Sequence, residues 1–322
     1  MRGYYTRKLL LTAAAAAAAA FAAPAAVTTA FAQAAAAPAS PHTFTGNMTI
    51  GSDYRFRGIS QTFGGPTIQG GVDYSHASGF YVGNWNSNVS GVTYNSGNNI
   101  EMDFYAGWKG SWGDWGLDVG NLYYYYDSAR WTGLNQQAAA RAVAAGNQNN
   151  SGRYDNNEIY IAGSWKWLSA KYSYATTNYF GLNDALARNT NSKDCFAAGG
   201  TAGTPAAICT GTRGGFLAAT NENRGNSKGS GYFQIDASYE FAPKWTIIGH
   251  AGKLSVKNYN ELNYTDYKLG VTYDLSGWVL GAAAIGTSAN KQWYAGQRAV
   301  GGVNGTKDLG TTTLVLTVAK TF

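Results

Sequence analysis

Charge is scarce in this chain, and so are histidine, cysteine and proline. Only 13% of its 322 residues are charged, whereas soluble domains average about 25%, so much of the surface is expected to face something other than water. The three histidines (His42, His76 and His250) are scattered, and neither cysteine has one nearby, which argues against a metal site. The sequence also lacks phosphate-binding glycine loops and cofactor motifs, so we expect no cofactor.

Aromatic residues and glycine are instead abundant, at 14% and 42 residues. Low charge with many Tyr and Trp residues is typical of a protein in contact with a membrane. Beyond the first 32 residues, however, no apolar run reaches the ~18 residues that a membrane-spanning helix needs. A membrane location would then require a closed β-barrel, because only there do all backbone groups pair between strands.

The N-terminus has the form of an export signal. A basic segment at residues 2–8 precedes an apolar run from Leu9, and Ala30-Phe31-Ala32 forms a small-x-small cleavage site. We predict a cleaved signal peptide over residues 1–32 and an N-terminal periplasmic segment over 33–42. The alternative, an uncleaved membrane helix, is disfavoured because the run is mainly alanine and contains a proline.

Export also bears on possible partners and on the cysteines. Cleavage would remove three basic residues and take the net charge from +6 to +3, which gives no reason to expect a nucleic-acid partner. Cys195 and Cys209 would meet an oxidising periplasm, where a disulfide between them is expected. It would close a loop of about 15 residues, worth roughly 3 kcal/mol in the chain-entropy model. Two unpaired thiols are the alternative.

Side chains alternate between apolar and polar along most of the chain, as in strands with a lipid side and a water side. In the stretch 264–275, for example, Tyr267 and Leu269 share one face, whereas Asp266 and Lys268 share the other. The stretches 100–109 and 233–241 show the same separation. Twelve such segments start near residues 43, 66, 79, 98, 115, 154, 168, 229, 244, 263, 278 and 311.

These segments predict an all-β fold, a transmembrane antiparallel up-and-down barrel of 12 strands over residues 43–322. Short turns alternate with longer links, which places both termini in the periplasm and the long links outside. The longest external loop is expected at 180–228, and its Gly-rich sequence could fold inward as a constriction. A soluble β-sandwich also alternates, but it explains the aromatic residues poorly.

The two ends of the predicted barrel carry further signals. In the first strand the alternation continues past Ile50, so that Tyr54 and Phe56 are expected to face outward and the charged residues between them inward. The last strand ends on Phe322, resembling the terminal aromatic that the barrel-assembly machinery reads, and Lys320 is expected to reach water at the interface. An interfacial girdle is expected from Trp112, Trp115, Trp165, Trp167, Trp245 and Trp278.

The block SDYRFRGISQT at residues 52–62 resembles the TorF family of porins from Gram-negative bacteria. The resemblance continues through Pro66, Gln69-Gly70-Gly71, Asp73-Tyr74, Ser78-Gly79-Phe80-Tyr81, Trp85, Ser87-Asn88-Val89, Glu101 with Asp103, Tyr172-Ser173-Tyr174, Asp266 to Val271 and Lys320-Thr321-Phe322. It covers nearly the whole mature chain and implies a channel in the bacterial outer membrane, without catalytic residues. The stretch 180–228 looks like an insertion, so no role is carried over to it.

A barrel of this size predicts a porin, through which small hydrophilic solutes diffuse passively. Nine acidic and six basic residues are expected to line the lumen, which favours a mild preference for cations or a network of stabilising ion pairs. They are Asp53, Arg55, Arg57, Asp73, Glu101, Asp103, Lys109, Glu158, Lys166, Lys171, Asp236, Glu240, Asp266, Lys268 and Asp274.

Two alternative functions remain open at this stage. One is a sealed barrel that acts as a structural anchor or displays its loops as a binding surface. The other is an outer-membrane hydrolase, for which His250 is the one candidate general base, although a lumen histidine is more often a hydrogen-bonded wall residue.

Overall fold

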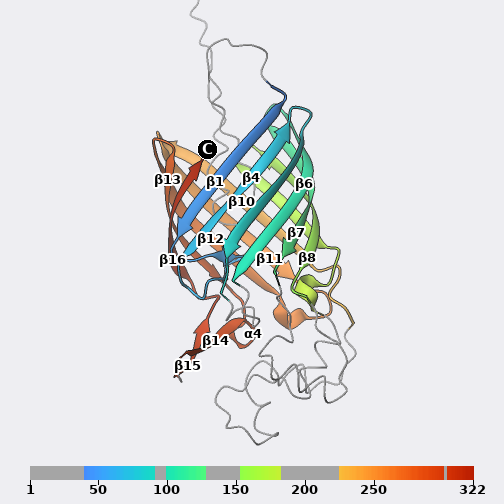
Figure 1. Ribbon diagram of the computed structural model, residues 1–322, viewed down its shortest axis with the longest axis vertical. Helices are drawn as coiled ribbons and strands as arrows, with labels where there is room; N and C mark the ends of the chain where they lie inside the picture. The colour runs from blue at the N-terminus through green and yellow to red at the C-terminus, as the bar shows by residue number, and fades with distance from the viewer. Residues whose placement is uncertain (1–39, 91–98, 128–152, 183–224, 301–302) are drawn as a thin grey trace, which may run out of the picture.

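The protein is a closed antiparallel β-barrel. The computed structural model describes residues 40–90, 99–127, 153–182, 225–300 and 303–322. Within these residues twelve strands form the barrel wall in the order β1-β16-β13-β12-β11-β10-β9-β8-β7-β6-β5-β4 (Figure 1). They are β1 (His42–Gly51), β4 (Thr67–His76), β5 (Phe80–Asn88), β6 (Ile100–Trp112), β7 (Trp115–Tyr125), β8 (Asn156–Trp165), β9 (Leu168–Ala175), β10 (Gly231–Ala242), β11 (Trp245–Ser255), β12 (Tyr264–Leu275), β13 (Trp278–Thr287) and β16 (Thr313–Thr321).

The first and last strands close the barrel. β1 pairs antiparallel with β16 from Asn47 opposite Thr321 to Gly51 opposite Thr317. Backbone bonds in both directions between Gly46 and Phe322, of 3.1 and 2.8 Å, extend this pairing to the chain end. The predicted twelve-strand barrel is therefore confirmed, and an open sandwich is excluded.

Short turns gather at one end of the barrel, together with the C-terminus, and long connections gather at the other (Figure 1). At the short-turn end β12 and β13 are joined by Ser276 and Gly277, whose φ angles of 54° and 86° fit the tight type I′ hairpin turn. The expected alternation of short and long links thus holds for the described strands. The predicted signal peptide, both cysteines and most of the 180–228 loop lie outside the described residues.

The outward face of the wall is apolar. Its exposed side chains include Phe44, Ile50, Ile68, Val72, Phe104, Ile161, Phe233, Leu269, Leu314 and Leu316. All six tryptophans expected at the short-turn end are exposed there, and the Lys320 ammonium lies 5.3 Å from the centre of the Trp278 ring. Among the described residues no helix is long and apolar enough to cross a membrane.

Smaller elements lie at the long-connection end. They are the 3-10 turns η2 (Tyr179–Gly181) and η3 (Asn260–Leu262), the helix α4 (Lys291–Tyr294), and the hairpin of β14 (Ala295–Val300) and β15 (Val303–Asp308). Figure 1 shows the β14-β15 hairpin projecting beyond the barrel wall.

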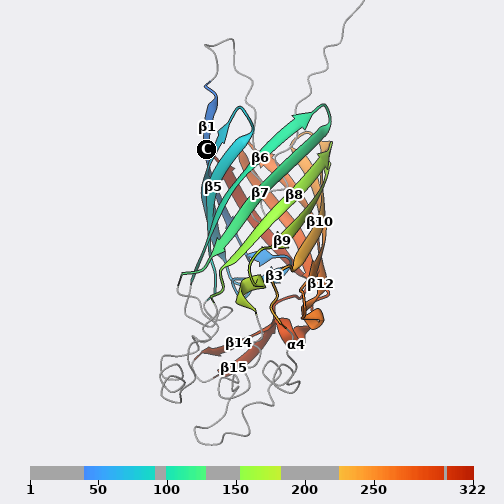
Figure 2. The ribbon, with the colours of Figure 1, turned by 90° about the vertical axis from the view of Figure 1, so that its right-hand side faces the viewer.

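The sequence prediction for the first strand is wrong beyond Gly51. The chain leaves the wall there and forms a small hairpin of β2 (Arg55–Phe56) and β3 (Ile59–Ser60), which Figure 2 shows inside the outline of the barrel. Arg57 and Gly58 form its turn, with φ angles of 47° and 76°. Tyr54 and Phe56, expected to face lipid, are 3% and 9% exposed, because they pack inside the barrel. We call residues 53–62 the luminal hairpin.

Candidate functional site

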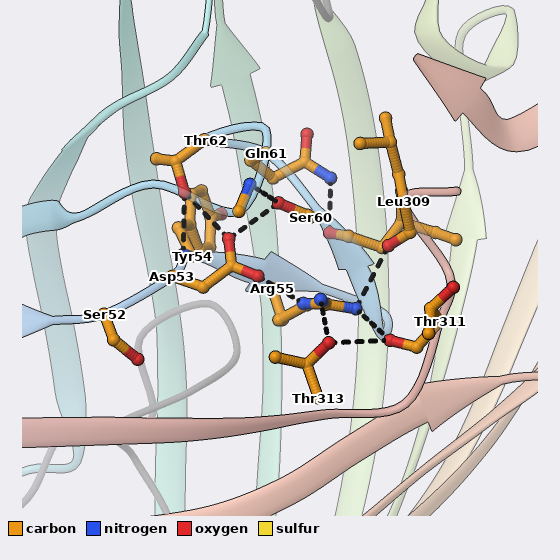
Figure 3. A network of polar contacts seen from close by, with 12 residues as sticks. Ser52, Asp53, Tyr54, Arg55, Ser60, Gln61, Thr62, Leu309, Thr311 and Thr313 are labelled. Carbon is orange, nitrogen blue, oxygen red and sulfur yellow. Dashed lines mark hydrogen bonds and ion pairs between the residues drawn. The ribbon is translucent and has the colours of Figure 1, made fainter. Parts of the chain in front are cut away.

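The luminal hairpin is held by a polar network around Asp53 and Arg55 (Figure 3). Arg55 Nε donates to Asp53 Oδ2 at 2.6 Å, and the hydroxyls of Ser60 and Thr62 donate to Asp53 Oδ1 at 2.6 and 2.8 Å. The other end of the Arg55 guanidinium reaches the segment before β16. It donates to the backbone oxygens of Leu309 and Thr311 at 3.0 and 2.9 Å, and to the Thr313 hydroxyl at 2.9 Å.

Arg57, at the tip of the luminal hairpin, binds the wall at β8. Its Nη2 donates to both carboxylate oxygens of Glu158, at 3.0 and 2.8 Å, and Nη1 donates to the Tyr179 hydroxyl at 2.9 Å. Burial raises the pKa of Tyr179 to about 12, so this hydroxyl stays protonated. The guanidinium also lies 4.1 Å from the Tyr232 ring centre, a cation–π contact. In the barrel order β8 lies far from β1, so the hairpin spans the lumen.

Apolar side chains pack on both sides of the luminal hairpin. Phe56 belongs to a buried cluster with Tyr54, Tyr81, Val89, Tyr105, Leu122, Tyr124, Tyr126 and Tyr154. Ile59 belongs to a second cluster with Leu182, Tyr232, Leu254, Val256, Tyr259, Tyr264 and Leu309. The lumen around the hairpin is therefore packed like a protein core, with the hairpin between the clusters.

A histidine is fixed between two carboxylates on the lumen wall. His250 on β11 lies 2.7 Å from Asp236 on β10 through Nδ1, and 2.8 Å from Asp266 on β12 through Nε2. The Tyr232 hydroxyl also bonds Asp266, at 2.8 Å. Because both partners of the ring are hydrogen-bond acceptors, the geometry fits an imidazolium that donates twice. Such a ring has no free nitrogen to act as a general base.

Two acidic residues of β6 are fully buried but differ in their partners. Glu101 accepts hydrogen bonds from the hydroxyls of Tyr54 and Tyr126, both at 2.8 Å. Asp103, two residues along the same strand, has no hydrogen-bond partner for either carboxylate oxygen. Among the described residues no group of three or more His, Cys, Asp or Glu side chains has the geometry to hold a metal ion.

In the half of the lumen nearer the short turns, tyrosines lie flat along the wall. The Tyr105 ring covers Gly83 on β5 so closely that a Cβ atom there would lie 2.5 Å from the ring, and Tyr160 covers Gly120 in the same way, at 2.7 Å. Tyr81 donates to Asp118 at 2.6 Å and also bonds the Tyr160 hydroxyl, while Tyr105 donates to Asp73. This arrangement holds these rings against the wall.

The structure places the sequence-predicted residues in three groups. Asp53, Arg55 and Arg57 lie on the luminal hairpin rather than on β1. Asp73, Glu101, Asp103, Lys109, Glu158, Lys171, Asp236, Asp266 and Lys268 lie on the inner side of the wall. Lys166, Glu240 and Asp274 do not line the lumen but are exposed at the short-turn end. Lys166 stands in a turn with φ of 53°, where water solvates its ammonium group 3.7 Å from Asp114.

Sequence reasoning missed Asp118 and the inward tyrosines. Asp118 lies on β7, where the alternation is weak because glycines interrupt it. The signal that could have identified the tyrosines is a glycine opposite or diagonal to each on the adjoining strand, which leaves room for a flat ring.

A closed barrel with an apolar exterior and a charged interior is the architecture of outer-membrane channels, and the similar solved structures are porins. The KdgM porin is 9% identical (TM-score 0.44), with 86% of this chain and 99% of that chain covered. The KdgM porin in complex with disordered oligogalacturonate is 9% identical, with a TM-score of 0.43 and coverage of 87% of this chain and 99% of that chain. A porin refined at 1.8 Å resolution is 10% identical, with a TM-score of 0.35 and coverage of 87% of this chain and 100% of that chain. At these scores the likeness is one of fold.

The chain belongs to the Gcw_chp family, described as bacterial proteins of unknown function, whose family model matches residues 35–322. The comparison with curated proteins gives no match. The resemblance to the TorF family is not confirmed by these comparisons.

Proposed function

We propose that this protein is an outer-membrane porin, a passive diffusion channel for small hydrophilic solutes. The observation that carries the proposal is the separation of side chains across one closed wall. Leu269 on β12 faces outward and is 62% exposed, whereas its neighbour Lys268 faces the lumen. An apolar exterior fits outer-membrane lipid, and a charged lumen fits water and polar solutes. The resemblance of residues 52–62 to the TorF porins supports the same function.

The luminal hairpin is the constriction of the proposed channel. It lies between two apolar clusters, whereas the inward residues Asp118 and Lys171, near the short turns, are only partly buried. Solute flow is therefore limited at the hairpin.

The same packing favours a second candidate, a sealed barrel that serves as a structural anchor. Every residue from Asp53 to Thr62 is buried, and both arginines of the hairpin are held by several hydrogen bonds. In this case the wild-type barrel would not conduct, and its function would lie in the external segments.

Conductance in planar bilayers distinguishes the two candidates. Gly51 and Thr67 already face each other across β1 and β4, so residues 52–66 can be replaced by an Asn-Gly turn without changing the register. We expect wild-type protein to conduct and the shortened variant to conduct at least several-fold more. A silent wild type with a conducting shortened variant favours the anchor, and silence of both folded proteins rejects the channel. Retained β-sheet circular dichroism and heat-modifiable gel migration show that each barrel is folded.

A further inference from the structure

Two lysines on the lumen wall near the short turns have ammonium groups that contact tyrosine rings. The ammonium groups of Lys109 on β6 and Lys171 on β9 form no hydrogen bond, and no ion pair within 4 Å, with any described residue. Their ammonium groups instead lie over tyrosine rings, Lys109 at 5.4 Å from the centre of Tyr81 and Lys171 at 4.2 Å from that of Tyr160. A cation–π contact leaves the N–H donors of an ammonium available.

Strand register places both lysines in one row across the wall. Lys109 is opposite Asp118 on β7, Asp118 is opposite Ala162 on β8, and Ala162 is opposite Lys171. Three strand spacings separate the lysines, or about 14 Å between their Cα atoms. Ala162, between Asp118 and Lys171, contributes only a methyl group to this row, and we call these four residues the lysine row.

The carboxylates around the lysine row are already engaged. Asp118 accepts from Tyr81, Asp73 accepts from Tyr105, and Asp236 accepts from His250. A hydrogen bond from tyrosine leaves the charge of a carboxylate in place, but it directs the bonded oxygen toward the wall. Several acidic groups are buried around the luminal hairpin or bonded to the wall, whereas the half-buried ammonium groups keep unused donors.

We propose that the lysine row is a binding site for small organic anions, in which Lys171 and Lys109 hold a carboxylate and the tyrosine-lined wall holds the ring that bears it. The proposal rests on the porin function only for how solutes arrive. A sugar acid has both parts, because its carboxylate accepts from ammonium and the CH groups of its ring pack on aromatic faces.

Three sugars with one ring and different charge provide the test: glucuronate, glucose and glucosamine. Binding of each to the detergent-solubilised protein is measured by isothermal titration calorimetry, which does not require an open channel. We expect glucuronate to bind more tightly than glucose and glucosamine. Lys171→Met and Lys109→Met, which keep the side-chain length, should each weaken glucuronate binding roughly threefold. Lys244→Met, in an exposed short turn outside the row, should leave it unchanged.

Vesicles that contain the protein and are loaded with all three sugars then give the relative efflux rates of the sugars in a single preparation. We expect glucuronate to leave faster than glucosamine through wild-type protein, and Lys171→Met to remove this difference without slowing glucose. Binding without efflux keeps the site and rejects the porin; efflux of all three without preferential glucuronate binding keeps the porin and rejects the site. Equal binding of the three sugars to the wild type, or an unchanged preference in the folded Lys109→Met/Lys171→Met protein, overturns the proposal.

Discussion

The guanidinium of Arg57 and the carboxylate of Glu158 meet inside the barrel although 101 positions separate them in the sequence, and Nη2 donates to both carboxylate oxygens. Both side chains are nearly inaccessible to solvent, at 6% and 3%. The pair joins the tip of the luminal hairpin to β8, so two parts of the fold that share no sheet pairing depend on it.

Arg57→Met should therefore destabilise the barrel strongly. Removing one partner leaves the Glu158 charge buried without its main counter-ion, which costs about 3–5 kcal/mol. Arg57→Met/Glu158→Met should recover most of this loss, because no charge then remains unpaired. Arg153→Met is the matched control, because the Arg153 side chain is 50% exposed in its pair with Asp155. This substitution should lower the free energy of unfolding by less than about 1 kcal/mol. Urea unfolding in micelles gives the free energy of unfolding of the wild type and the three variants. Equal losses from Arg57→Met and Arg153→Met would contradict a stabilising role of the Arg57–Glu158 ion pair.

Gly83→Ala tests the flat tyrosines. The added Cβ would lie 2.5 Å from Cε2, Cζ and the hydroxyl oxygen of Tyr105, so the ring must move away from the wall and from Asp73. Overpacking of this kind costs about 1–3 kcal/mol. Gly163→Ala, also within a strand, meets nothing within 4 Å and should be neutral or slightly stabilising. Thermal melting of the two variants should separate them clearly; a common melting temperature would show that the ring does not depend on Gly83.

The two buried acids of β6 should respond in opposite ways to apolar replacement. Glu101→Met removes the acceptor of the Tyr54 and Tyr126 hydroxyls and should cost about 1–3 kcal/mol. Asp103→Leu removes a carboxyl that has no hydrogen-bond partner, so stability should be unchanged or higher. Both are read from chemical denaturation at neutral pH, and a large loss from Asp103→Leu would reveal a bonded role for that carboxyl.

Phe322→Ser should affect assembly more than stability. The Phe322 side chain is 70% exposed on the outer face, whereas the backbone bonds to Gly46 do not depend on it. Refolded protein should therefore keep its unfolding midpoint within experimental error. If the terminal aromatic is the signal for the assembly machinery, the amount of folded protein in the envelope should fall several-fold. Normal envelope levels of Phe322→Ser would remove Phe322 from that role.

The barrel could be predicted from the sequence because each wall residue faces either lipid or the lumen, and its polarity follows the side it faces. On β12, Asp266 and Lys268 face inward and Tyr267 and Leu269 outward, as the alternation indicates. The luminal hairpin could not be predicted in the same way. Asp53, Arg55 and Arg57 alternate with Tyr54 and Phe56 as a wall strand would, but here the apolar side chains are buried against other side chains instead of lipid.

The site was only partly accessible to sequence reasoning for a related reason. Periodicity assigns Lys109 and Lys171 to the inner face, but it does not tell which inward charges are already bonded. Glu158 and Lys171 both occupy inward positions of strands in which apolar and polar residues alternate. Glu158 is nevertheless bonded to Arg57, whereas Lys171 lies over Tyr160. Such differences depend on residues from distant strands, which pair only after the sheet has closed.

The anchoring of Arg55 also sets an order of events during biogenesis. Its backbone and hydroxyl acceptors at Leu309, Thr311 and Thr313 come from the final residues of the chain, more than 250 positions later. Contacts of such sequence separation form late, because a large loop must close first. The bonds of Arg55 to residues 309–313 therefore form only when the final strand arrives, so the hairpin becomes fully anchored as the barrel closes.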